Sequence, residues 1–503
     1  MSDRKSTGSL FITLDMGTTS VKVSLFNSNG DMLATSLDEY SLHTPEKDVV
    51  ELHAEIYWDC CRKGIRYILG TSGVSPCQIK SIGVCSQGET LIVLDSDGRP
   101  LRKAIVWLDN RSYDEADTIR RVFGTENNTG QIDVCPSWPI TKIFWLKKHE
   151  PEVFKRIDKF MLVEDYILYR LTGTFNGEYS LYSSSYMLDI VNKQWWRELL
   201  DFVGIEDEQL VSLCEPGEII GPVTRQVSRE LGLDPSTVVV TGAMDQIAAM
   251  IGSGNIHQGI VTETTGAALV VCSTLDAFPG HETGLMAVQY HAVPGKYLVI
   301  GWCPTGGMAL KWLRDSFFIT KRDEAISQNK DPYTELTMMA ENIPPGSQGL
   351  LFYPYLAGPG TSDVDPDARG VFYGIEMHHK GEHFIKAVME SLAFVLRKNL
   401  EAVEALGIPC AEFISLGGGA GSRLWNTIKA DVTGKPVKTL KCSEAASLGT
   451  AILQARALGL FPDMETAVKN MVHVSSIVYP EQDRCRIYED VYRRFRLIER
   501  RCF

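Results

Sequence analysis

One pattern occurs twice in this chain, about half a chain apart. It consists of a buried strand, a short turn of small residues and a second strand. The first copy spans residues 10–26 around Gly17-Thr18-Thr19, and the second spans residues 259–272 around Thr264-Thr265-Gly266. An echo at this spacing predicts two similarly built domains. The alternative is a pair of unrelated hairpins, which are common in proteins.

The segments between the two copies alternate between strand and helix patterns. The turn Asn29-Gly30 leads the first hairpin into a third strand, so the chain begins as a β-meander. Residues 55–69 predict a helix, and residues 79–85 and 238–241 predict short apolar strands. Residues 242–255 form a segment rich in small residues. We therefore expect an α/β fold with domains at 1–254 and 255–503.

Three turns rich in glycine, threonine and serine each follow a short strand. They are Asp15–Lys22, Thr264–Ala268 and Gly417–Ser422, and Ser422 is a plausible N-cap for a helix starting at Arg423. Glycine lets the backbone approach a ligand, and successive backbone N–H groups and a helix N-terminus favour phosphate oxygens. A single such turn is more often structural. Three in one chain favour a phosphate-binding function.

Two common nucleotide-binding patterns are absent. Gly434-Lys435 is followed by Pro436 and lacks the upstream glycine of a P-loop. The run Gly417–Gly421 does not fit GxGxxG, because Ser422 follows it. A Walker-type NTPase and a Rossmann dehydrogenase are both disfavoured.

Two aspartates stand at the ends of predicted strands near these turns. Asp15 ends the first strand and Asp245 follows the strand at 238–241. Mg²⁺ that accompanies a nucleotide takes one or two carboxylates, and an attacking hydroxyl needs a carboxylate base. Asp15 could serve the metal and Asp245 the hydroxyl. The structural alternative for each is a turn or cap aspartate.

Charge and composition narrow the choice of partners. The net charge of −13 argues against nucleic acid or an anionic membrane as the main partner. We expect no membrane span and no secretory signal, and therefore a cytoplasmic protein. The 12 cysteines contain no CxxC and fit buried free thiols in a reducing compartment.

The order and spacing of these turns resemble the FGGY family of carbohydrate kinases, which includes glycerol kinase and xylulokinase. The resemblance extends from about Phe11 to Leu460. Two long family patterns are intact: Ser137-Trp-Pro-Ile-Thr-Lys-Ile-Phe-Trp-Leu-Lys-Lys-His149, and Gly370-Val-Phe-Tyr-Gly-Ile375 continuing to His383-Phe384 and Ala387-Val-Met-Glu390.

The resemblance implies two ribonuclease H-like domains of the actin/sugar kinase/Hsp70 superfamily, with ATP and sugar meeting in an interdomain cleft. It implies that Asp245 is the general base and that Asp15, together with Asp245, holds Mg²⁺. It assigns the nucleotide to Gly17, Thr18, Thr19, Ser20, Lys22, Thr265, Gly266, Gly307, Lys311, Gly418, Gly419 and Arg423. Family members are often homodimers or homotetramers, and the sequence does not decide between these states.

The acceptor region departs from the best-known members. Ser86-Gln-Gly-Glu-Thr90 looks like the Asn-Gln-Arg-Glu-Thr of glycerol kinase, with Gly88 in place of arginine, and Ser137 replaces a glycerol-binding tyrosine. We therefore expect a roomier pocket that takes a four- to six-carbon ketose or polyol, with xylulose as a candidate. The hydroxyl partners would be Gln87, Glu89, Asp109, Gln246 and Ser137.

Three other classes compete with a kinase. An actin-like or Hsp70-like ATPase would share the phosphate turns, but not the cluster around Gln87 and Glu89. A degenerate sugar-binding regulator is disfavoured because Asp15, Asp245 and all three turns are intact. A hydrolase of sugar phosphates would need a positioned water and a sugar-phosphate site, and the sequence indicates neither.

Overall fold

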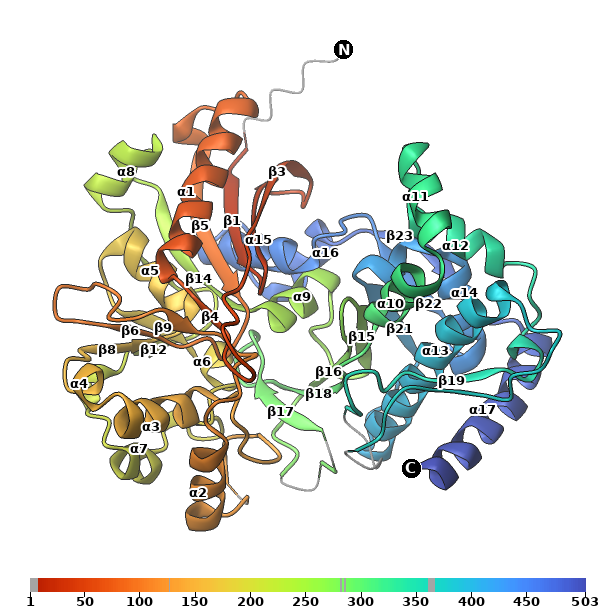
Figure 1. The fold of residues 1–503 in the computed structure, drawn as a ribbon. Coiled ribbons are helices and arrows are strands. Elements are labelled where there is room, and N and C mark those ends of the chain that lie inside the picture. The colour runs from red at the N-terminus through yellow and green to blue at the C-terminus, as the bar shows by residue number, and fades with distance from the viewer. Residues whose placement is uncertain (1–7, 126, 281–282, 285, 361–366) are drawn as a thin grey trace.

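The computed structural model describes residues 8–125, 127–280, 283–284, 286–360 and 367–503. The chain forms two α/β lobes, with the N-terminus on the first and the C-terminus on the second (Figure 1). Each lobe is built on one large sheet.

The first sheet has six strands, and it contains both parallel and antiparallel pairs. Its order is β13 (Ile219–Pro222), β14 (Val238–Met244), β5 (Ile79–Ser86), β1 (Leu10–Met16), β2 (Ser20–Asn27) and β3 (Met32–Glu39). β14, β5 and β1 are parallel, whereas β1, β2 and β3 form the predicted antiparallel meander. The central strands are buried along nearly their whole length, which explains their continuous apolar runs.

The second sheet repeats this plan. Its order is β23 (Val474–Val478), β22 (Val437–Leu440), β21 (Glu412–Leu416), β15 (Ile260–Thr265), β16 (Leu269–Leu275), β18 (Tyr297–Cys303) and β17 (Ala287–Tyr290). β22, β21 and β15 are parallel, and β15, β16 and β18 form an antiparallel meander. The echo between residues 10–26 and 259–272 is therefore a repeated domain architecture rather than two unrelated hairpins. The boundary between residues 254 and 255 stays a prediction.

The remaining elements pack around these sheets. The helices of the first half are α1 (Ala54–Thr71), α2 (Tyr113–Phe123), α3 (Pro139–His149), α4 (Pro151–Phe154), α5 (Val163–Thr172), α6 (Tyr179–Tyr182), α7 (Arg197–Val203), α8 (Arg225–Leu231) and α9 (Asp245–Ser253). Those of the second half are α10 (Gly307–Phe317), α11 (Ile319–Ser327), α12 (Pro332–Ala340), α13 (Gly381–Ala405), α14 (Arg423–Thr433), α15 (Ala445–Ala457), α16 (Met464–Met471) and α17 (Gln482–Cys502).

Short strands and 3₁₀ turns complete the structure. The strands are β4 (Glu51–Leu52), β6 (Ile92–Leu94), β7 (Ala104–Ile105), β8 (Lys159–Met161), β9 (Asn176–Glu178), β10 (Leu188–Asp189), β11 (Gln194–Trp195), β12 (Ser212–Cys214), β19 (Leu351–Tyr353) and β20 (Val371–Tyr373). The 3₁₀ turns are η1 (Pro76–Gln78), η2 (Asp207–Gln209), η3 (Ser347–Gly349) and η4 (Gly418–Gly421). No helix in the described ranges is both long and apolar enough to cross a bilayer.

One expectation from the sequence needs revision. The small-residue segment at 242–255 contains a helix, α9, which starts at Asp245. Its composition hides it, because Gly252 lowers helix propensity. Contacts with α15 from the other half of the chain stabilise it. The predicted N-cap at Ser422 is confirmed, since its side chain accepts a hydrogen bond from the amide of Trp425.

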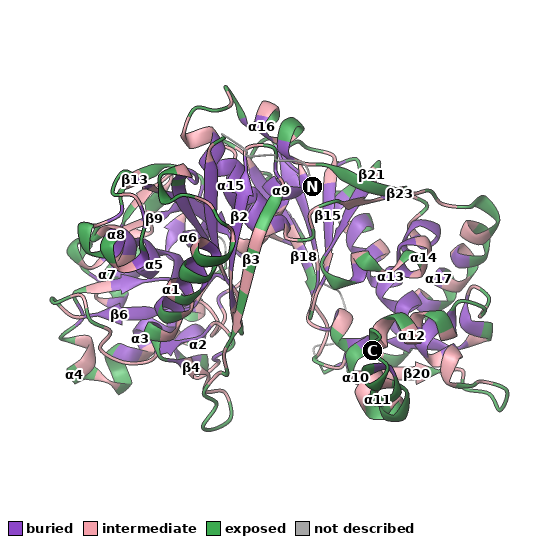
Figure 2. Cartoon of the chain, turned by 90° about the horizontal axis from the view of Figure 1, so that it is seen from above, coloured by how far each residue is buried: buried purple, intermediate pink, exposed green. Residues whose placement is uncertain are grey.

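The two lobes meet where α9 crosses α15. A Cβ atom on Gly252 would lie 1.9 Å from the carbonyl oxygen of Ala445, and one on Gly449 would lie 1.8 Å from that of Ala248. The two backbones therefore touch at a point that only glycine allows. Buried residues fill this contact, as Figure 2 shows from above.

Helix α15 also reaches into the first sheet through one amide side chain. Gln454 donates to the carbonyl of Ile12 at 3.1 Å and accepts from the hydroxyl of Ser81 at 2.6 Å. All three residues are buried. A helix from the second half of the chain is therefore part of the packing of the first sheet.

We predict that Gly449→Ala destabilises the protein by roughly 1–3 kcal/mol, because the added methyl group would force two helix backbones apart. The measurement is the thermal unfolding midpoint. Gly70→Ala is the matched control, since Gly70 lies in α1 with no atom within 4 Å of an added Cβ. It should stabilise the protein by up to ~1 kcal/mol. Equal midpoints for the two variants would contradict the close crossing.

Candidate functional site

The carboxyl ends of three adjacent parallel strands bring the predicted catalytic residues together. Asp15 in β1 lies opposite Cys85 in β5, and Met244 in β14 lies opposite Ser86. Asp15, Gln87 and Asp245 therefore share one edge of the first sheet. Ligands of open α/β sheets bind at this edge.

The pairing of β14 is irregular just before its last residue, and two side chains hold the backbone there. The pairing of β14 with β5 shifts register between Thr241 and Met244. The amide of Gly242 donates to Oε1 of Glu164 at 3.0 Å, and that of Met244 donates to Oγ of Ser180 at 3.2 Å. This irregular strand end turns directly into α9 and presents Asp245 as its first residue.

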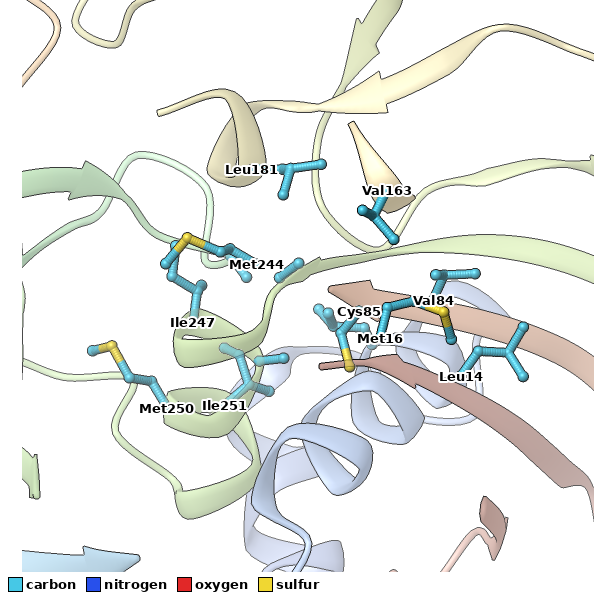
Figure 3. Packing of buried hydrophobic residues seen from close by; sticks show 14 of the residues in the cluster. Leu14, Met16, Val84, Cys85, Val163, Leu181, Met244, Ile247, Met250 and Ile251 are labelled. Atoms are coloured by element: carbon cyan, nitrogen blue, oxygen red, sulfur yellow. The ribbon is translucent and has the colours of Figure 1, made fainter. Parts of the chain in front are cut away.

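Buried apolar side chains also pack around the end of β14. Figure 3 shows Met244 and Ile247 beside Leu181, and Met16, Val84 and Cys85 packed near the adjoining strands. These side chains are buried. The carboxyl groups at the edge of the sheet therefore lie next to an apolar layer, which raises the free energy needed to ionise them.

Burial dominates the electrostatics of this site. It raises the pKa of Asp245 to about 7, and the negative charges of Asp15 and Glu89 add to the shift. Burial also raises the pKa of Asp15 to about 6, although the charge of Lys22 opposes the rise. The N-terminus of α9 favours an ionised Asp245, but this effect is smaller than the loss of hydration. The site therefore collects carboxyl groups that titrate close to neutral pH.

Lys22 connects the first turn to the second half of the chain. Its Nζ forms an ion pair with Glu444, the residue that precedes α15. Both side chains are partly exposed. Because Lys22 lowers the pKa of Asp15 and Glu444 raises it, the two charges partly cancel at Asp15.

The first predicted phosphate turn is closed by its own backbone. The amide of Gly17 donates to the carbonyl of Ser20 at 2.9 Å. Nε1 of Trp107 donates to Oγ1 of Thr18 at 2.9 Å, a contact that the sequence did not predict. The amides of Thr18 and Thr19 donate to no acceptor among the described residues, so they are free for phosphate oxygens.

The second and third turns are in direct contact. A Cβ atom on Gly419 would lie 2.7 Å from Cβ of Thr265, and one on Gly417 would lie 2.8 Å from the carbonyl oxygen of Thr265. The amide of Gly307, which begins α10, donates to the carbonyl of Gly266 at 2.7 Å. Residues far apart in the sequence thus form one glycine-rich surface.

A buried ion pair supports this surface from beneath. Nζ of Lys429 in α14 lies 2.7 Å from Oε2 of Glu263 and donates to Oγ1 of Thr265 at 3.1 Å and to Oγ of Ser415 at 3.0 Å. Thr265 donates its hydroxyl to Glu263. The side chain of Thr265 is therefore fully engaged, and the free groups of this turn belong to its backbone. No sequence motif indicated Lys429.

A cavity of about 960 Å³ opens beside the third turn. Gly418, Arg423, Leu440, Ile477, Tyr479 and Arg484 are among the residues that line it. Its volume is in the range of small-molecule sites. It places Gly418 and Arg423, two of the residues predicted for the adenosine end, on one wall.

Two of the predicted acceptor residues, Glu89 and Ser137, contact a buried lysine that the sequence did not single out. Lys142 in α3 donates to the carbonyl of Ser137 at 2.6 Å and to that of Glu89 at 3.2 Å. Burial raises the pKa of Glu89 to about 7 and lowers that of Lys142 to about 8, while their opposite charges counter both shifts. Gln246 follows Asp245 and donates its amide to that carboxylate at 2.6 Å.

Two predicted residues are engaged elsewhere. The carboxylate of Asp109 is buried, forms an ion pair with Arg111 at 2.7 Å and accepts from the amide of Val50 at 2.6 Å. Lys311 is half exposed and pairs with Asp315 at 2.7 Å, one turn along α10. Their roles in binding stay predictions.

The space beside Gly88 is already filled. A Cβ atom there would lie 2.7 Å from Oγ of Ser184 and 3.3 Å from Sδ of Met244. Ser184 is also a hydrogen-bond partner of Glu89. The serine occupies part of the room that the missing arginine was expected to leave, and the larger pocket stays a prediction.

Comparisons with known proteins agree on one family. The N-terminal domain of the FGGY family of carbohydrate kinases matches residues 10–252, and its C-terminal domain matches residues 260–458. A xylulose kinase of Staphylococcus epidermidis is 30% identical over 480 residues, which cover 95% of this chain and 94% of that protein. A gluconokinase of Bacillus subtilis is 30% identical over 485 residues, covering 95% and 93%.

Solved structures show the same fold. A ligand-bound xylulose kinase from Lactobacillus acidophilus superimposes with a TM-score of 0.88 at 24% identity, covering 98% of both chains. A xylulose kinase from Rhodospirillum rubrum gives 0.87 at 26% identity, covering 97% of this chain and 98% of that one. The two-domain α/β prediction is therefore confirmed.

We predict that the ligand-free protein loses stability as pH rises from about 4 to about 8. Asp245, Glu89 and Asp165 have pKa values raised to about 7, and Glu178 to about 8. A carboxyl group whose pKa is raised by folding contributes its full stability below the pKa of the unfolded chain, and this contribution is lost as pH rises from there through the raised value. Each group changes the free energy of unfolding by up to ~1.4 kcal/mol per pH unit.

Thermal unfolding midpoints across this range test the prediction. Asp245→Asn removes one titrating group and should flatten the fall. A midpoint that rises with pH in the wild-type protein would contradict the proposed protonation of the buried carboxyl groups.

Proposed function

The chain belongs to the FGGY family of carbohydrate kinases, and from that premise we propose the chemistry and the acceptor class of its site. The protein is a sugar or polyol kinase that uses ATP. We propose that Asp245 is its general base and that its acceptor is a neutral four- to six-carbon ketose or polyol.

The proposed reaction is a direct phosphoryl transfer. Asp245 accepts the proton of the acceptor hydroxyl, and the oxygen forms a bond to the γ-phosphorus of ATP. The bond between that phosphorus and the bridging oxygen breaks, and ADP leaves with the electron pair. Such transfers depend on alignment and charge neutralisation more than on covalent help. A base with a pKa of about 7 suits proton transfer near neutral pH.

The donor set at the strand ends fits Mg²⁺. The charge of Asp15 raises the pKa of Asp245, and a divalent cation would relieve this repulsion. Mg²⁺ that accompanies a nucleotide takes one or two carboxylates and completes its shell with phosphate oxygens and water. Bound there, Mg²⁺ would neutralise charge on the phosphates.

The sign of the charge in the pocket supports a neutral acceptor. Asp15, Glu89 and Asp245 contribute three carboxyl groups. Lys142 already donates hydrogen bonds to the backbone carbonyls of Glu89 and Ser137. A sugar acid would add a further carboxylate to this environment, which costs free energy without a free cation. Xylulose, the substrate named for several relatives, is a neutral five-carbon ketose and remains our candidate.

One observation carries the proposal most strongly. Asp245 is placed at the start of α9 by an irregular strand end that the side chains of Glu164 and Ser180 hold, and burial raises its pKa to about 7. A cap or turn aspartate would be exposed and would titrate near its usual value. This environment is typical of a catalytic carboxylate.

We predict that Asp245→Asn lowers kcat by about 10²–10⁴-fold while leaving the Kd for ADP nearly unchanged, because the amide keeps the shape of the site but cannot accept the proton. Steady-state rates and calorimetric ADP titration measure the two quantities. Near-normal turnover of this variant would refute the assigned role.

We predict that a coupled ADP-release assay finds a neutral ketose or polyol as the best acceptor. The panel contains glycerol, tetritols, pentitols, pentuloses, hexuloses and gluconate, each with MgATP. We expect a pentulose such as xylulose to exceed gluconate by at least about tenfold in kcat/KM, because the carboxylates repel the acid. A preference for gluconate would refute the charge argument, and a preference for glycerol would refute the larger pocket.

A further inference from the structure

Lys142 in α3 is a fully buried cation. Its side chain is 0% exposed and is among the largest buried side chains of the protein. Lysine is rarely buried to this extent unless it is paired with a carboxylate. Among the described residues Lys142 forms no ion pair, and its Nζ donates instead to the backbone carbonyls of Ser137 at 2.6 Å and Glu89 at 3.2 Å. This lysine therefore interacts with the backbone of two predicted acceptor residues rather than with an acidic side chain.

The two carbonyl groups belong to segments that are separate in the sequence. Glu89 lies between β5 and β6, and Ser137 lies shortly before α3. Both residues are partly exposed, whereas Lys142 has no exposed surface. Lys142 therefore bridges two segments of the predicted acceptor region, and it can act on an acceptor only through them.

The backbone at Glu89 is strained. Its φ of +57° lies in the left-handed region, which residues other than glycine rarely adopt. The amide of Thr90 donates to the carbonyl of Gly88 at 2.7 Å, which closes a three-residue γ-turn around Glu89. A γ-turn with a positive φ at its centre is rare, and such a conformation persists only where the surrounding structure holds it.

Backbone hydrogen bonds anchor this turn on both sides. The amide of Gln87 donates to the carbonyl of the last residue of β1 at 2.8 Å, and Leu91 and Ile105 exchange two backbone bonds of 2.9 Å. At the strained residue itself, the carbonyl of Glu89 accepts from Lys142. A charged donor makes a stronger hydrogen bond than a neutral one. Lys142 therefore stabilises the turn at its strained centre.

We propose that Lys142 is a positioning residue for the sugar or polyol acceptor: by holding the carbonyls of Glu89 and Ser137, it fixes the strained turn and the distance between the two segments. This inference rests on the proposed function of the site. The carboxylate of Glu89 is thereby kept in one place, where it can accept a hydrogen bond from an acceptor hydroxyl. A fixed distance between the segments also limits the length of the acceptor that fits. Lys142 therefore acts on acceptor affinity and on the choice between acceptors, but not on the nucleotide.

The test compares the wild-type protein with Lys142→Met and with the control Lys147→Met. Methionine is unbranched and suits a buried position, but it cannot donate a hydrogen bond. Lys147 lies in the same helix, is exposed and donates to the backbone carbonyl of Val203 in α7 at 2.7 Å. If Lys142→Met fails to fold, Lys142→Gln, which keeps one donor group, takes its place. Kinetic constants are measured for MgATP and for D-xylulose, or for another acceptor that the panel identifies.

In Lys142→Met we expect the KM for D-xylulose to rise about tenfold or more, with the KM for ATP unchanged within about twofold. The ratio of kcat/KM between the best acceptor and the next one on the panel should fall about threefold or more, because the segments are no longer held at one distance. Lys147→Met should match the wild-type protein in all three quantities. A purely structural role would lower the thermal midpoint and the activity while leaving the KM for the acceptor and the acceptor preference unchanged, and that result would overturn the proposal.

A double-mutant cycle with Glu89→Gln tests whether Lys142 acts through Glu89. Each single variant should lower kcat/KM for D-xylulose about tenfold. If Lys142 positions Glu89, the double variant should lose clearly less than the product of the two losses, which is about hundredfold. A loss equal to the product would mean that the two residues act independently, and it would contradict the positioning role.

Hydrogen exchange tests the turn without any acceptor. In Lys142→Met the amide of Thr90, which closes the turn, should exchange about tenfold faster or more than in the wild-type protein and in Lys147→Met. An unchanged exchange rate at Thr90 would show that Lys142 does not hold the turn. If the wild-type protein phosphorylates no sugar on the panel, the proposed acceptor class fails instead, and the exchange rate at Thr90 still decides whether Lys142 holds the turn.

Discussion

The positions of Asp245 and Glu444 depend on the contact between α9 and α15. Gly252 and Gly449 let the two helix backbones touch, and each helix begins at the site. Asp245 is the first residue of α9, and Glu444, which pairs with Lys22, precedes α15. A change in this crossing would therefore move Asp245, the proposed general base, together with the charge beside Asp15. Because packed interfaces shift in steps rather than continuously, the crossing also suits a motion of one lobe against the other.

The two lobes share a backbone plan, but different side chains support the predicted phosphate turn in each lobe. Each turn follows the first strand of a meander, in β1–β2 and in β15–β16. In the first lobe the turn is held by Tyr40 and Trp107, which leave the amides of Thr18 and Thr19 free. In the second lobe the turn rests on the buried pair of Lys429 and Glu263. The two turns thus have the same backbone arrangement but unrelated side-chain contacts. The sequence repeats only the strand–turn–strand pattern that produces this arrangement.

The sequence could predict features that depend on local patterns, but not contacts between segments that are far apart in the chain. The strands, the turns and the two-domain plan depend on local patterns, and the prediction of each was correct. Helix α9 was missed because its stability comes from α15, about 200 residues away. The ion pair of Asp109 with Arg111 and its bond to the amide of Val50 are visible only in three dimensions, and its role in substrate binding stays a prediction. Lys142 and Lys429 were missed for the same reason, since each is buried among groups from distant segments.

The excess of carboxyl groups at the site links its stability to its chemistry. Burying Asp15, Glu89 and Asp245 in one region raises their pKa values to between about 6 and 7, so the ligand-free site opposes its own ionisation near neutral pH. The same shift gives Asp245 a proton affinity suited to a base that must take up a proton during each turnover. Replacing these carboxylates by amides should therefore reduce the repulsion while abolishing the proton transfer at Asp245. In the proposed mechanism, the carboxylate whose charge destabilises the ligand-free site is also the group that accepts the proton, and an amide in the same place could not accept it.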